Sequence, residues 1–352
     1  MHEIRKQIYE YFFLQEADVD VYFTENIWVP KGARGVFGKS SISFIQNHSL
    51  SLLTCYNIQT IGGQSLHSYF LLAGKEDEPI YYHVERIRDG KSFASRNVLA
   101  KQKGRIIFAL SCSFQVPEKS SIEHQYKMPD VVPPEESQEY QELQRDINVM
   151  RHPNKEYDGF EKVGRISMNV FRATPKDIEL KKIFDLATPS KIEERAKSGK
   201  AYSDDEISTP YDLWWIKMMD DLSHLKIQLH QCLLAYISDH TLLSAIRLPH
   251  FTGSNINKNK RNMVVSLDHT VWFHTPFRAD KWLLYEIESP RLVNGRGLAF
   301  GKVYDNNGVL VASVSQEGLF RTISLDDRGK RNEPLLFTSN SPVLSKQKQP
   351  KL

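Results

Sequence analysis

The feature that most constrains this chain is the run from Met263 to His274, where apolar and polar side chains alternate and β-branched and aromatic residues are frequent. Such a pattern predicts a β-strand with one buried face. Asn307-Gly308, between two apolar runs, is a strong signal for a hairpin turn. Three further strands are predicted later in the sequence, at 282–286, 297–304 and 309–315. The C-terminal part of the chain is therefore predicted to hold about four antiparallel strands joined by short turns.

A helix followed by such strands is predicted twice along the chain. In the second half, a helix from about Leu222 to Ala245 carries an apolar stripe at three- and four-residue steps. In the first half, a helix after Gly38 precedes strands predicted at 66–73, 80–88, 92–102 and 106–114. Residues 65–70 and 266–273 also resemble each other, which indicates an internal duplication. The expected fold is α+β, with two helix-plus-antiparallel-meander repeats sharing one curved sheet.

Changes in composition suggest the domain boundaries. We predict an N-terminal unit over 1–117, a linker over 118–157, a C-terminal unit over 158–340 and a tail over 341–352. The linker is acidic, bears several prolines and has only weak periodicity. Within the units, three local predictions are made: one helix over residues 1–30 followed by a short strand near Trp28, a mostly charged insertion over 175–210, and a loop over 249–262.

The bulk composition narrows the classes of function. The chain has 352 residues, enough for two domains, with 40% apolar and 25% charged residues, as in ordinary globular proteins. Lysine and arginine number 46 against 43 aspartates and glutamates, a balance too even to indicate a nucleic-acid partner. The three cysteines, Cys55, Cys112 and Cys232, are far apart, so neither a zinc site nor a disulfide framework is expected. No metal and no cofactor are predicted.

Membrane insertion is not expected, because no apolar run reaches the ~18 residues that a spanning helix needs. The N-terminus begins a mixed-charge amphipathic segment that does not resemble a signal peptide. The chain ends in Pro350-Lys351-Leu352, and a C-terminal Ser-Lys-Leu is a peroxisomal address. Two interpretations of this end stay open: an address read by the peroxisomal import receptor, or a polar tail. The expected location is accordingly the peroxisome matrix, otherwise the cytoplasm.

Several multi-residue blocks, found in order, resemble those of the type II acyl-CoA thioesterases, and most closely the peroxisomal eukaryotic members. The resemblance covers most of residues 28–130 and 211–321, and its clearest blocks are His67–Phe70, Arg88–Phe93, Ala235–Asp239, Val265–His269, Pro276–Asp280 and Gln316–Gly318. This family has a double hotdog fold. The resemblance therefore implies a hydrolase that releases free fatty acid and coenzyme A from fatty acyl-CoA.

The resemblance also implies a catalytic set of three residues. The family's aspartate stands in a Tyr-x-Ser-Asp block, here Asp239, and its serine or threonine stands two residues before an Asp-His pair, here Ser266. Its glutamine opens a Gln-Glu-Gly block, here Gln316. Asp239 would activate a water as general base, and the other two would hold that water in place. Each also has a structural interpretation, as a capping, sheet or turn residue.

Two further sets of residues are candidates for the site. Histidine is the usual general base near neutral pH, but the family does not use the Asp268-His269 pair in that role, so we interpret the pair as structural. The basic residues Lys258, Lys260 and Arg261 precede the predicted catalytic strand. They could bind the phosphates of coenzyme A, although a solvated loop is the simpler interpretation.

One block departs from the family, which usually has Gly-Gly-Gln where this chain has Gly38-Lys39-Ser40. That departure keeps a second hypothesis open, a catalytically inactive acyl-CoA binding protein of the same fold. A third is a hotdog enoyl-CoA hydratase, whose chemistry wants an Asp/His pair at a helix start. The sequence leaves open the acyl-chain preference, the groups that stabilise the oxyanion, and the assembly state, with a homo-oligomer among the alternatives.

Overall fold

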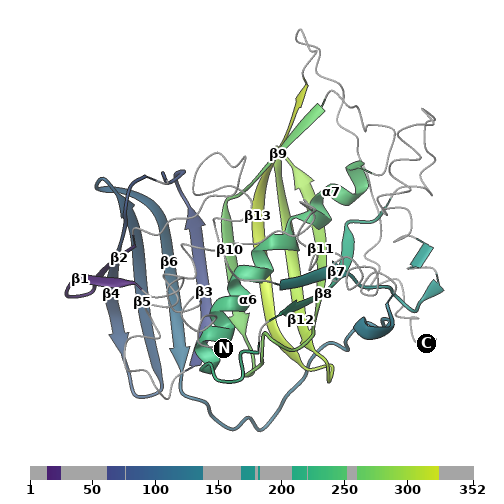
Figure 1. Ribbon diagram of the computed structural model, residues 1–352, viewed down its shortest axis with the longest axis horizontal. Coiled ribbons are helices and arrows are strands. Elements are labelled where there is room, and N and C mark those ends of the chain that lie inside the picture. The colour runs from purple at the N-terminus through teal and green to yellow at the C-terminus, as the bar shows by residue number, and fades with distance from the viewer. Residues whose placement is uncertain are drawn as a thin grey trace, which may run out of the picture.

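A computed structural model describes residues 14–24, 62–75, 77–137, 168–178, 181–182, 208–219, 221–251 and 260–324. Within these ranges the strands form a single antiparallel sheet of thirteen strands, and two α-helices lie beside it (Figure 1). The strands are β1 Gln15–Asp18, β2 Val21–Thr24, β3 Gly62–Phe70, β4 Ile80–Asp89, β5 Phe93–Gln102, β6 Arg105–Gln115, β7 Met168–Arg172, β8 Tyr211–Met218, β9 Lys260–Ser266, β10 Asp268–Phe273, β11 Leu283–Val293, β12 Arg296–Asp305 and β13 Leu310–Ser324. The helices are α6 Ile227–Leu242, α7 Ser244–Phe251 and the short 3-10 turn η1 Pro134–Glu136.

The sheet is continuous across the two halves of the chain. Its order is β1-β2-β4-β5-β6-β3-β10-β13-β12-β11-β8-β7, with β9 paired to β13 beside this path. Strands before residue 116 therefore lie on one side and those after residue 167 on the other, as Figure 1 shows. The halves join where β3 pairs with β10, for example Leu66 with Val271. This confirms the prediction of two strand meanders that share one sheet.

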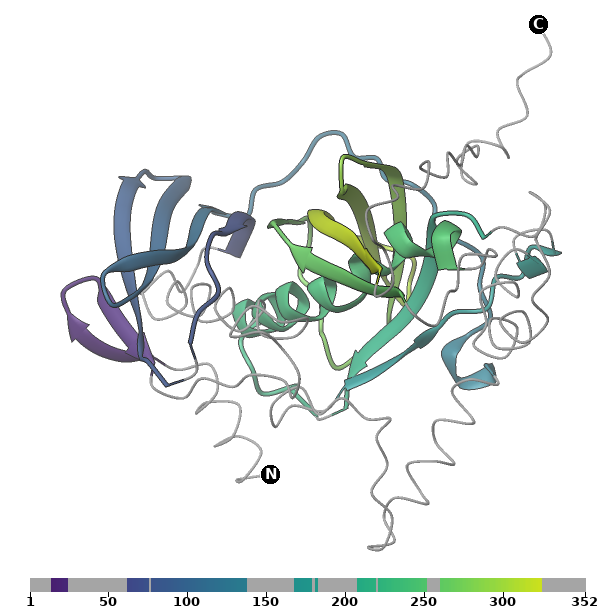
Figure 2. The ribbon, with the colours of Figure 1, turned by 90° about the horizontal axis from the view of Figure 1, so that it is seen from above.

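Helix α6 packs against the inner face of the curved sheet, where it contacts β3, β10, β12 and β13 (Figure 2). Its apolar stripe is fully buried, including Cys232, Leu233 and Ile237. A second apolar cluster lies on the other face of the C-terminal half, where Val131 of the predicted linker joins residues such as Trp282. Burial of apolar side chains on both faces of this half stabilises the strands that pack against α6.

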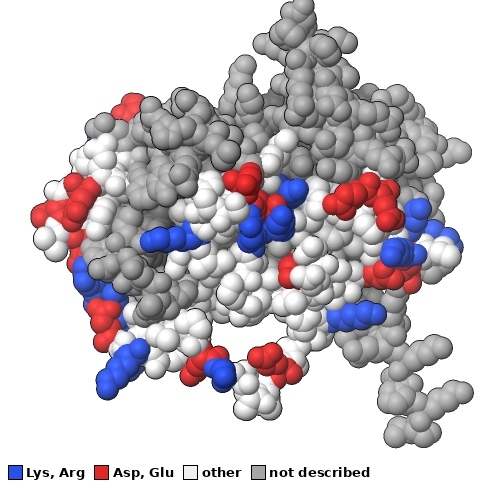
Figure 3. Space-filling model, turned by 60° about the horizontal axis from the view of Figure 1, so that its bottom comes forward, with Lys and Arg blue, Asp and Glu red and all other residues white. Residues whose placement is uncertain are grey.

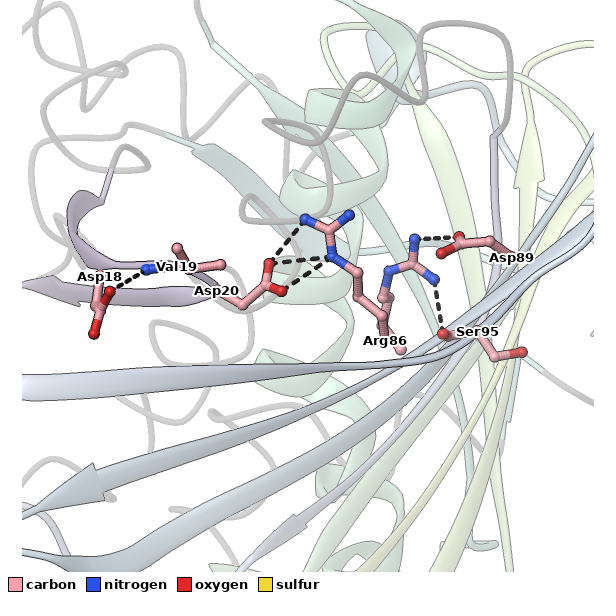
Figure 4. A network of polar contacts seen from close by, with 7 residues as sticks. Asp18, Val19, Asp20, Arg86, Asp89 and Ser95 are labelled. Atoms are coloured by element: carbon pink, nitrogen blue, oxygen red, sulfur yellow. Dashed lines mark hydrogen bonds and ion pairs between the residues drawn. The ribbon is translucent and has the colours of Figure 1, made fainter.

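The N-terminal prediction of one helix over residues 1–30 is wrong where the structure describes it. Residues 15–24 form the hairpin of β1 and β2, and Asp20 in its turn has a φ of 59°. The Asp20 carboxylate pairs with Arg86 of β4 at 3.0 Å (Figure 4). The Asp20 carbonyl also accepts a hydrogen bond from Val84 N of β4 at 2.8 Å. Aspartate tolerates a left-handed turn, and these contacts with the distant strand β4 hold the hairpin against the helical pattern around it.

Two boundaries in the second half also differ from the predictions. The helix predicted over 222–245 is two helices, α6 and α7, which divide at Leu243. The predicted loop from Pro249 begins too early, because Pro249 lies inside α7. Strand β13 runs on to Ser324, past the end predicted at residue 315.

The run that predicted one strand over 263–274 forms two strands, β9 and β10, with Leu267 between them. Ser266 pairs with Gly318 and Thr270 pairs with Ser315. The chain from β9 to β10 therefore has one residue more between these two pairs than β13 has opposite it. Such an extra residue is a β-bulge, which reverses the alternation of side chains beyond it. Ser266 and His269 consequently both face α6.

Several predictions fall outside the described residues: the first-half helix after Gly38, most of the insertion over 175–210, and the tail over 341–352. The division into an N-terminal unit, linker and C-terminal unit stays a prediction. Neither described helix is both long and apolar enough to cross a bilayer. On the face drawn in Figure 3, acidic and basic side chains of the described residues are interspersed.

Candidate active site

Asp239, Ser266 and Gln316 meet on the inner side of the sheet, although long stretches of chain separate them. The Ser266 hydroxyl donates to Asp239 Oδ1 at 3.3 Å. Gln316 Nε2 donates to Ser266 Oγ at 2.8 Å and to Asp239 Oδ1. All three are buried, with at most 7% of their surface exposed. The structure thus brings together the carboxylate, hydroxyl and carboxamide that the family resemblance implies.

Each of these side chains comes from a different element. Asp239 lies in the last turn of α6, Ser266 ends β9, and Gln316 lies within β13, although the sequence placed it at a strand end. A glycine brings the end of α6 close to the sheet: a Cβ at Gly318 would lie 2.7 Å from a methyl group of Leu243. This close approach allows Asp239 to reach across to β9 and β13.

The hydrogen bonds determine which way the Gln316 amide faces. Both hydrogens of Nε2 point to acceptors, one to Asp239 and one to Ser266. The reverse orientation would set Oε1 against a carboxylate, an unfavourable contact between two acceptors. Oε1 is fully buried and has no hydrogen-bond partner among the residues that the structure describes. A buried acceptor without a donor is costly, so this atom is suited to receive a hydrogen bond from a small molecule.

A second layer of polar groups supports Asp239 from behind. The Tyr285 hydroxyl donates to the Ser238 carbonyl at 3.0 Å, and burial raises the pKa of Tyr285 far above its usual value. His269 Nε2 lies 3.2 Å from Ser238 Oγ. Burial lowers the pKa of His269 to about 4, although the nearby Asp239 carboxylate acts in the opposite direction. His269 is therefore neutral near pH 7.

The sequence patterns do not predict the roles of Ser238 and Tyr285 in this layer. Tyr285 could have been noticed from Gly301 opposite its ring, because a small residue there leaves room for a large one: a Cβ at Gly301 would lie 2.3 Å from the ring of Tyr285. That signal has meaning only when the strand pairing is known.

The other candidates are placed less fully. Lys258 lies outside the described residues. The structure places Lys260 and Arg261 as the first two residues of β9. The departure at Gly38-Lys39-Ser40 lies outside them as well. His230 accepts a hydrogen bond from Ala279 N at 3.1 Å. Among the described residues, no three histidine, cysteine or acidic side chains are grouped as metal ligands.

The position of Asp239 bears on the hydratase hypothesis. That chemistry wants an Asp/His pair at a helix start, whereas Asp239 lies near the C-terminal end of α6. Its polar partners include a hydroxyl and a carboxamide. Such a group can hold a water and accept its proton, which suits hydrolysis of an activated ester.

Comparisons of the sequence with known proteins point in one direction. Residues 181–319 match the family described as acyl-CoA thioesterase, and residues 49–115 match the acyl-CoA thioesterase N-terminal domain. Acyl-coenzyme A thioesterase 8 of Rattus norvegicus is 36% identical over 309 residues, covering 88% of this chain and 87% of the relative. Peroxisomal acyl-coenzyme A thioester hydrolase 1 of Saccharomyces cerevisiae is 27% identical over 318 residues, covering 82% and 86%.

Solved structures agree with these relatives. The acyl-CoA thioesterase II TesB2 from Mycobacterium marinum superposes with a TM-score of 0.63 at 30% identity, covering 90% of this chain and 99% of that one. A hotdog-fold protein from Alicyclobacillus acidocaldarius, of unknown function, superposes with a TM-score of 0.56 at 13% identity, covering 89% and 97%. The second similarity concerns the fold alone, and it agrees with a double hotdog.

Proposed function

Because this chain belongs to the type II acyl-CoA thioesterase family, and is therefore a hydrolase of acyl-CoA thioesters, we propose that Asp239, Ser266 and Gln316 are its catalytic residues. The observation that carries the proposal is their shared hydrogen-bond cycle, in which the three side chains converge on Asp239 Oδ1. Fatty acyl-CoA is the proposed substrate, and free fatty acid and coenzyme A are the products.

In the proposed reaction a water bound beside Asp239 attacks the carbonyl carbon of the thioester. Asp239 accepts one proton of the water as general base while the new carbon–oxygen bond forms. The carbon–sulfur bond then breaks, and the coenzyme A thiolate takes up the proton. A thioester is an activated acyl group, so placing the water correctly accounts for a large part of the rate. No covalent acyl-enzyme is needed.

The contacts of Gln316 give it a specific role in this scheme. Since Nε2 is engaged by Asp239 and Ser266, its Oε1 is the group left to accept a hydrogen bond from the water. A water that donates one hydrogen to Oε1 and the other to Asp239 keeps its lone pairs free for attack. Ser266 also holds Asp239, because its hydroxyl donates to Oδ1 at 3.3 Å.

The test is Asp239→Asn, which keeps the shape of the side chain and removes the base. Turnover of a fatty acyl-CoA, followed by thiol release, should fall about 10²- to 10⁴-fold, the usual contribution of a general base. Asp221→Asn serves as the control, because Asp221 lies in the loop before α6 and 75% of its side chain is exposed. Undiminished turnover in Asp239→Asn, with the wild-type circular dichroism spectrum, would remove the proposed base.

The same assay separates the alternatives. A catalytically inactive acyl-CoA binding protein would bind the substrate, as seen by calorimetry, without releasing thiol from any acyl-CoA. An enoyl-CoA hydratase would consume the enoyl absorbance of its substrate and leave the thioester intact. The hydrolase releases one thiol for each acyl-CoA consumed, independently of an enoyl double bond.

For substrate binding, we keep the proposal that Lys258, Lys260 and Arg261 bind the phosphates of coenzyme A. In its support, β9 extends from Lys260 to Ser266, a separation of about 20 Å for six residues of extended strand. The nucleotide of coenzyme A is likewise held away from the thioester by a long pantetheine arm. Substitution of all three by alanine should raise KM for acyl-CoA and leave KM for acyl-pantetheine, which lacks the nucleotide, unchanged.

For location, we propose import into the peroxisome matrix through Pro350-Lys351-Leu352 and the import receptor. The support is the tail itself and the yeast relative, whose name places that protein in peroxisomes. A fluorescent protein fused to the N-terminus should mark peroxisomes, and removal of the last three residues should make the signal diffuse. A fusion that is already diffuse with its tail intact would place the enzyme in the cytoplasm instead.

A further inference from the structure

The bulge between β9 and β10 places Ser266 on the face where Asp239 lies. In a regular strand, residues three positions apart point to opposite faces of the sheet. Ser266 and His269 nevertheless both contact α6, through Asp239 and Ser238 respectively. Without the extra residue, Ser266 would face outward together with Thr270 and could not reach Asp239.

The backbone of Leu267 shows how the bulge is made. In a regular antiparallel strand the N–H and C=O of one residue point to the same neighbouring strand. Here Leu267 N donates to Glu317 O of β13 at 2.8 Å, whereas Leu267 O accepts from Phe70 N of β3 at 3.0 Å. In regular pairing the Leu267 carbonyl would accept a hydrogen bond from Glu317 N of β13. Here that carbonyl is bonded to β3 instead.

Asp268 takes the place of that missing acceptor. Its Oδ1 accepts a hydrogen bond from Glu317 N at 2.6 Å. A half-buried backbone N–H left without an acceptor would favour a return to regular pairing, in which Leu267 turns back toward β13. The Asp268 carboxylate removes that driving force, so its side chain holds the bulge in the observed register.

The hydrogen bond between Asp268 and Glu317 N affects Ser266 more than the rest of the site. Gln316 is held in regular register by β12 on the other side of β13, where it pairs with Ala299. Asp239 is held by α6. Of the three proposed catalytic residues, Ser266 is the one whose side-chain direction depends on the neighbouring bulge.

From these contacts we propose that Asp268 is a positioning residue for thioester hydrolysis, which acts by holding the bulge that turns Ser266 toward Asp239. The inference rests on the proposed role of Ser266. In this proposal Asp268 acts through the backbone of Glu317, to which its Oδ1 is bonded, and not on the water or substrate.

The experiment is a double-mutant cycle of Asp268→Ala and Ser266→Ala, read by kcat and KM for a fatty acyl-CoA. Asp268→Ala should lower kcat at least about tenfold, because a displacement near 1 Å at a catalytic group can cost far more. KM should change little. In the Ser266→Ala background, Asp268→Ala should change kcat less than about twofold, since coupled residues are not additive. Asp268→Asn keeps an Oδ1 acceptor and should retain most of the wild-type kcat.

Asp305→Ala is the matched control. Asp305 Oδ1 also accepts backbone hydrogen bonds, from Asn307 N and Val309 N at 2.9 Å each, in the turn between β12 and β13. It should lower the unfolding temperature to a similar extent as Asp268→Ala and leave kcat unchanged. If Asp268→Ala does not fold, Asp268→Glu, which moves the acceptor by one methylene, replaces it in the cycle.

Four outcomes of this experiment are distinguishable. Wild-type kcat in Asp268→Ala, or losses in the double variant that are additive, would overturn the positioning role while leaving the catalytic set intact. A Ser266→Ala variant with wild-type kcat would instead overturn the role of Ser266 in the proposed function. A loss in Asp268→Ala that disappears in the Ser266→Ala background, with recovery in Asp268→Asn, is the expected result.

Discussion

At the scale of single residues, His269 shows how burial changes chemistry. By residue type alone it is the natural general base of the Asp268-His269 pair. In the fold it is fully buried, its Nε2 is 3.2 Å from Ser238 Oγ, and its pKa is lowered to about 4 by burial. An imidazole that stays neutral and contacts a serine of α6 supports the helix turn that carries Asp239.

His269 should make the protein sensitive to acid. Above its ordinary pKa of 6.5 the imidazole is neutral in both the folded and the unfolded chain. As the pH falls from 6.5 toward 4, the unfolded chain binds a proton that the folded chain does not, so the free energy of unfolding decreases. The maximal slope for one group is about 1.4 kcal/mol per pH unit. Below about pH 4 this contribution levels off.

His269→Gln removes the titrating group and keeps an amide near the position of Nε2. Urea unfolding at pH 7 and pH 5 should show a larger loss of stability in the wild type than in the variant, by about 1–2 kcal/mol. His230 and His274, whose pKa values are also lowered by burial, are present in both proteins and cancel in the comparison. Equal pH dependence in the two proteins would contradict the assignment.

At the scale of elements, glycines in β12 and β13 leave room for large side chains that pack closely against these strands. A Cβ at Gly301 would meet the ring of Tyr285 at 2.3 Å, and a Cβ at Gly318 would meet Leu243 at 2.7 Å. The side chains of Tyr285 and Leu243 differ in how easily they can move aside. Tyr285 is fully buried and bonded to the Ser238 carbonyl, whereas the end of a leucine side chain can turn aside.

Gly301→Ala should therefore cost more than Gly318→Ala. We expect about 1–3 kcal/mol for Gly301→Ala, the range for overpacking a close-packed core, and a smaller cost for Gly318→Ala. Turnover should fall as well in Gly301→Ala, because Tyr285 supports the helix beside Asp239. Urea unfolding and thiol release measure the two effects, and the reverse order of stabilities would refute the explanation.

At the scale of the whole molecule, the two halves are joined by side chains as well as by the β3–β10 pair. Gln231 of α6 accepts from Gly63 N at 3.2 Å and donates to Gly63 O at 3.0 Å, which binds the helix of the second half to a strand of the first. Ser68 of β3 donates to the His269 carbonyl at 2.8 Å. The helix that carries Asp239 thus rests on both halves of the chain.

Gln231→Leu should destabilise the protein by about 1–3 kcal/mol, because it leaves two backbone groups of Gly63 without partners. Gln125→Leu is the matched control: Gln125 makes the same pair of bonds, with Gly308 O at 2.7 Å and Leu310 N at 3.0 Å, but in an exposed position where water can replace it. A free energy of unfolding that falls equally in both variants would show that the contact between the halves has no special weight.

The sequence by itself located most of the strands and pointed to the family. The strand predicted at 80–88 is β4 at Ile80–Asp89, because alternation of apolar side chains is a property of neighbouring residues. The resemblance pointed to Asp239, Ser266 and Gln316 through short blocks that need no knowledge of the fold. The hairpin at 15–24 was missed, because its turn is stabilised by Arg86, a residue far along the chain.

Only the tertiary structure decided how these parts meet. The pattern around Ser266 predicts one unbroken strand, and that strand would point the serine away from Asp239. The bulge at Leu267 reverses this direction, and it depends on acceptors and donors supplied by β3 and β13. The neutral state of His269 and the orientation of the Gln316 amide also depend on groups distant in sequence. Periodicity is encoded between neighbours, whereas hydrogen-bond partners and burial exist only once distant strands have paired.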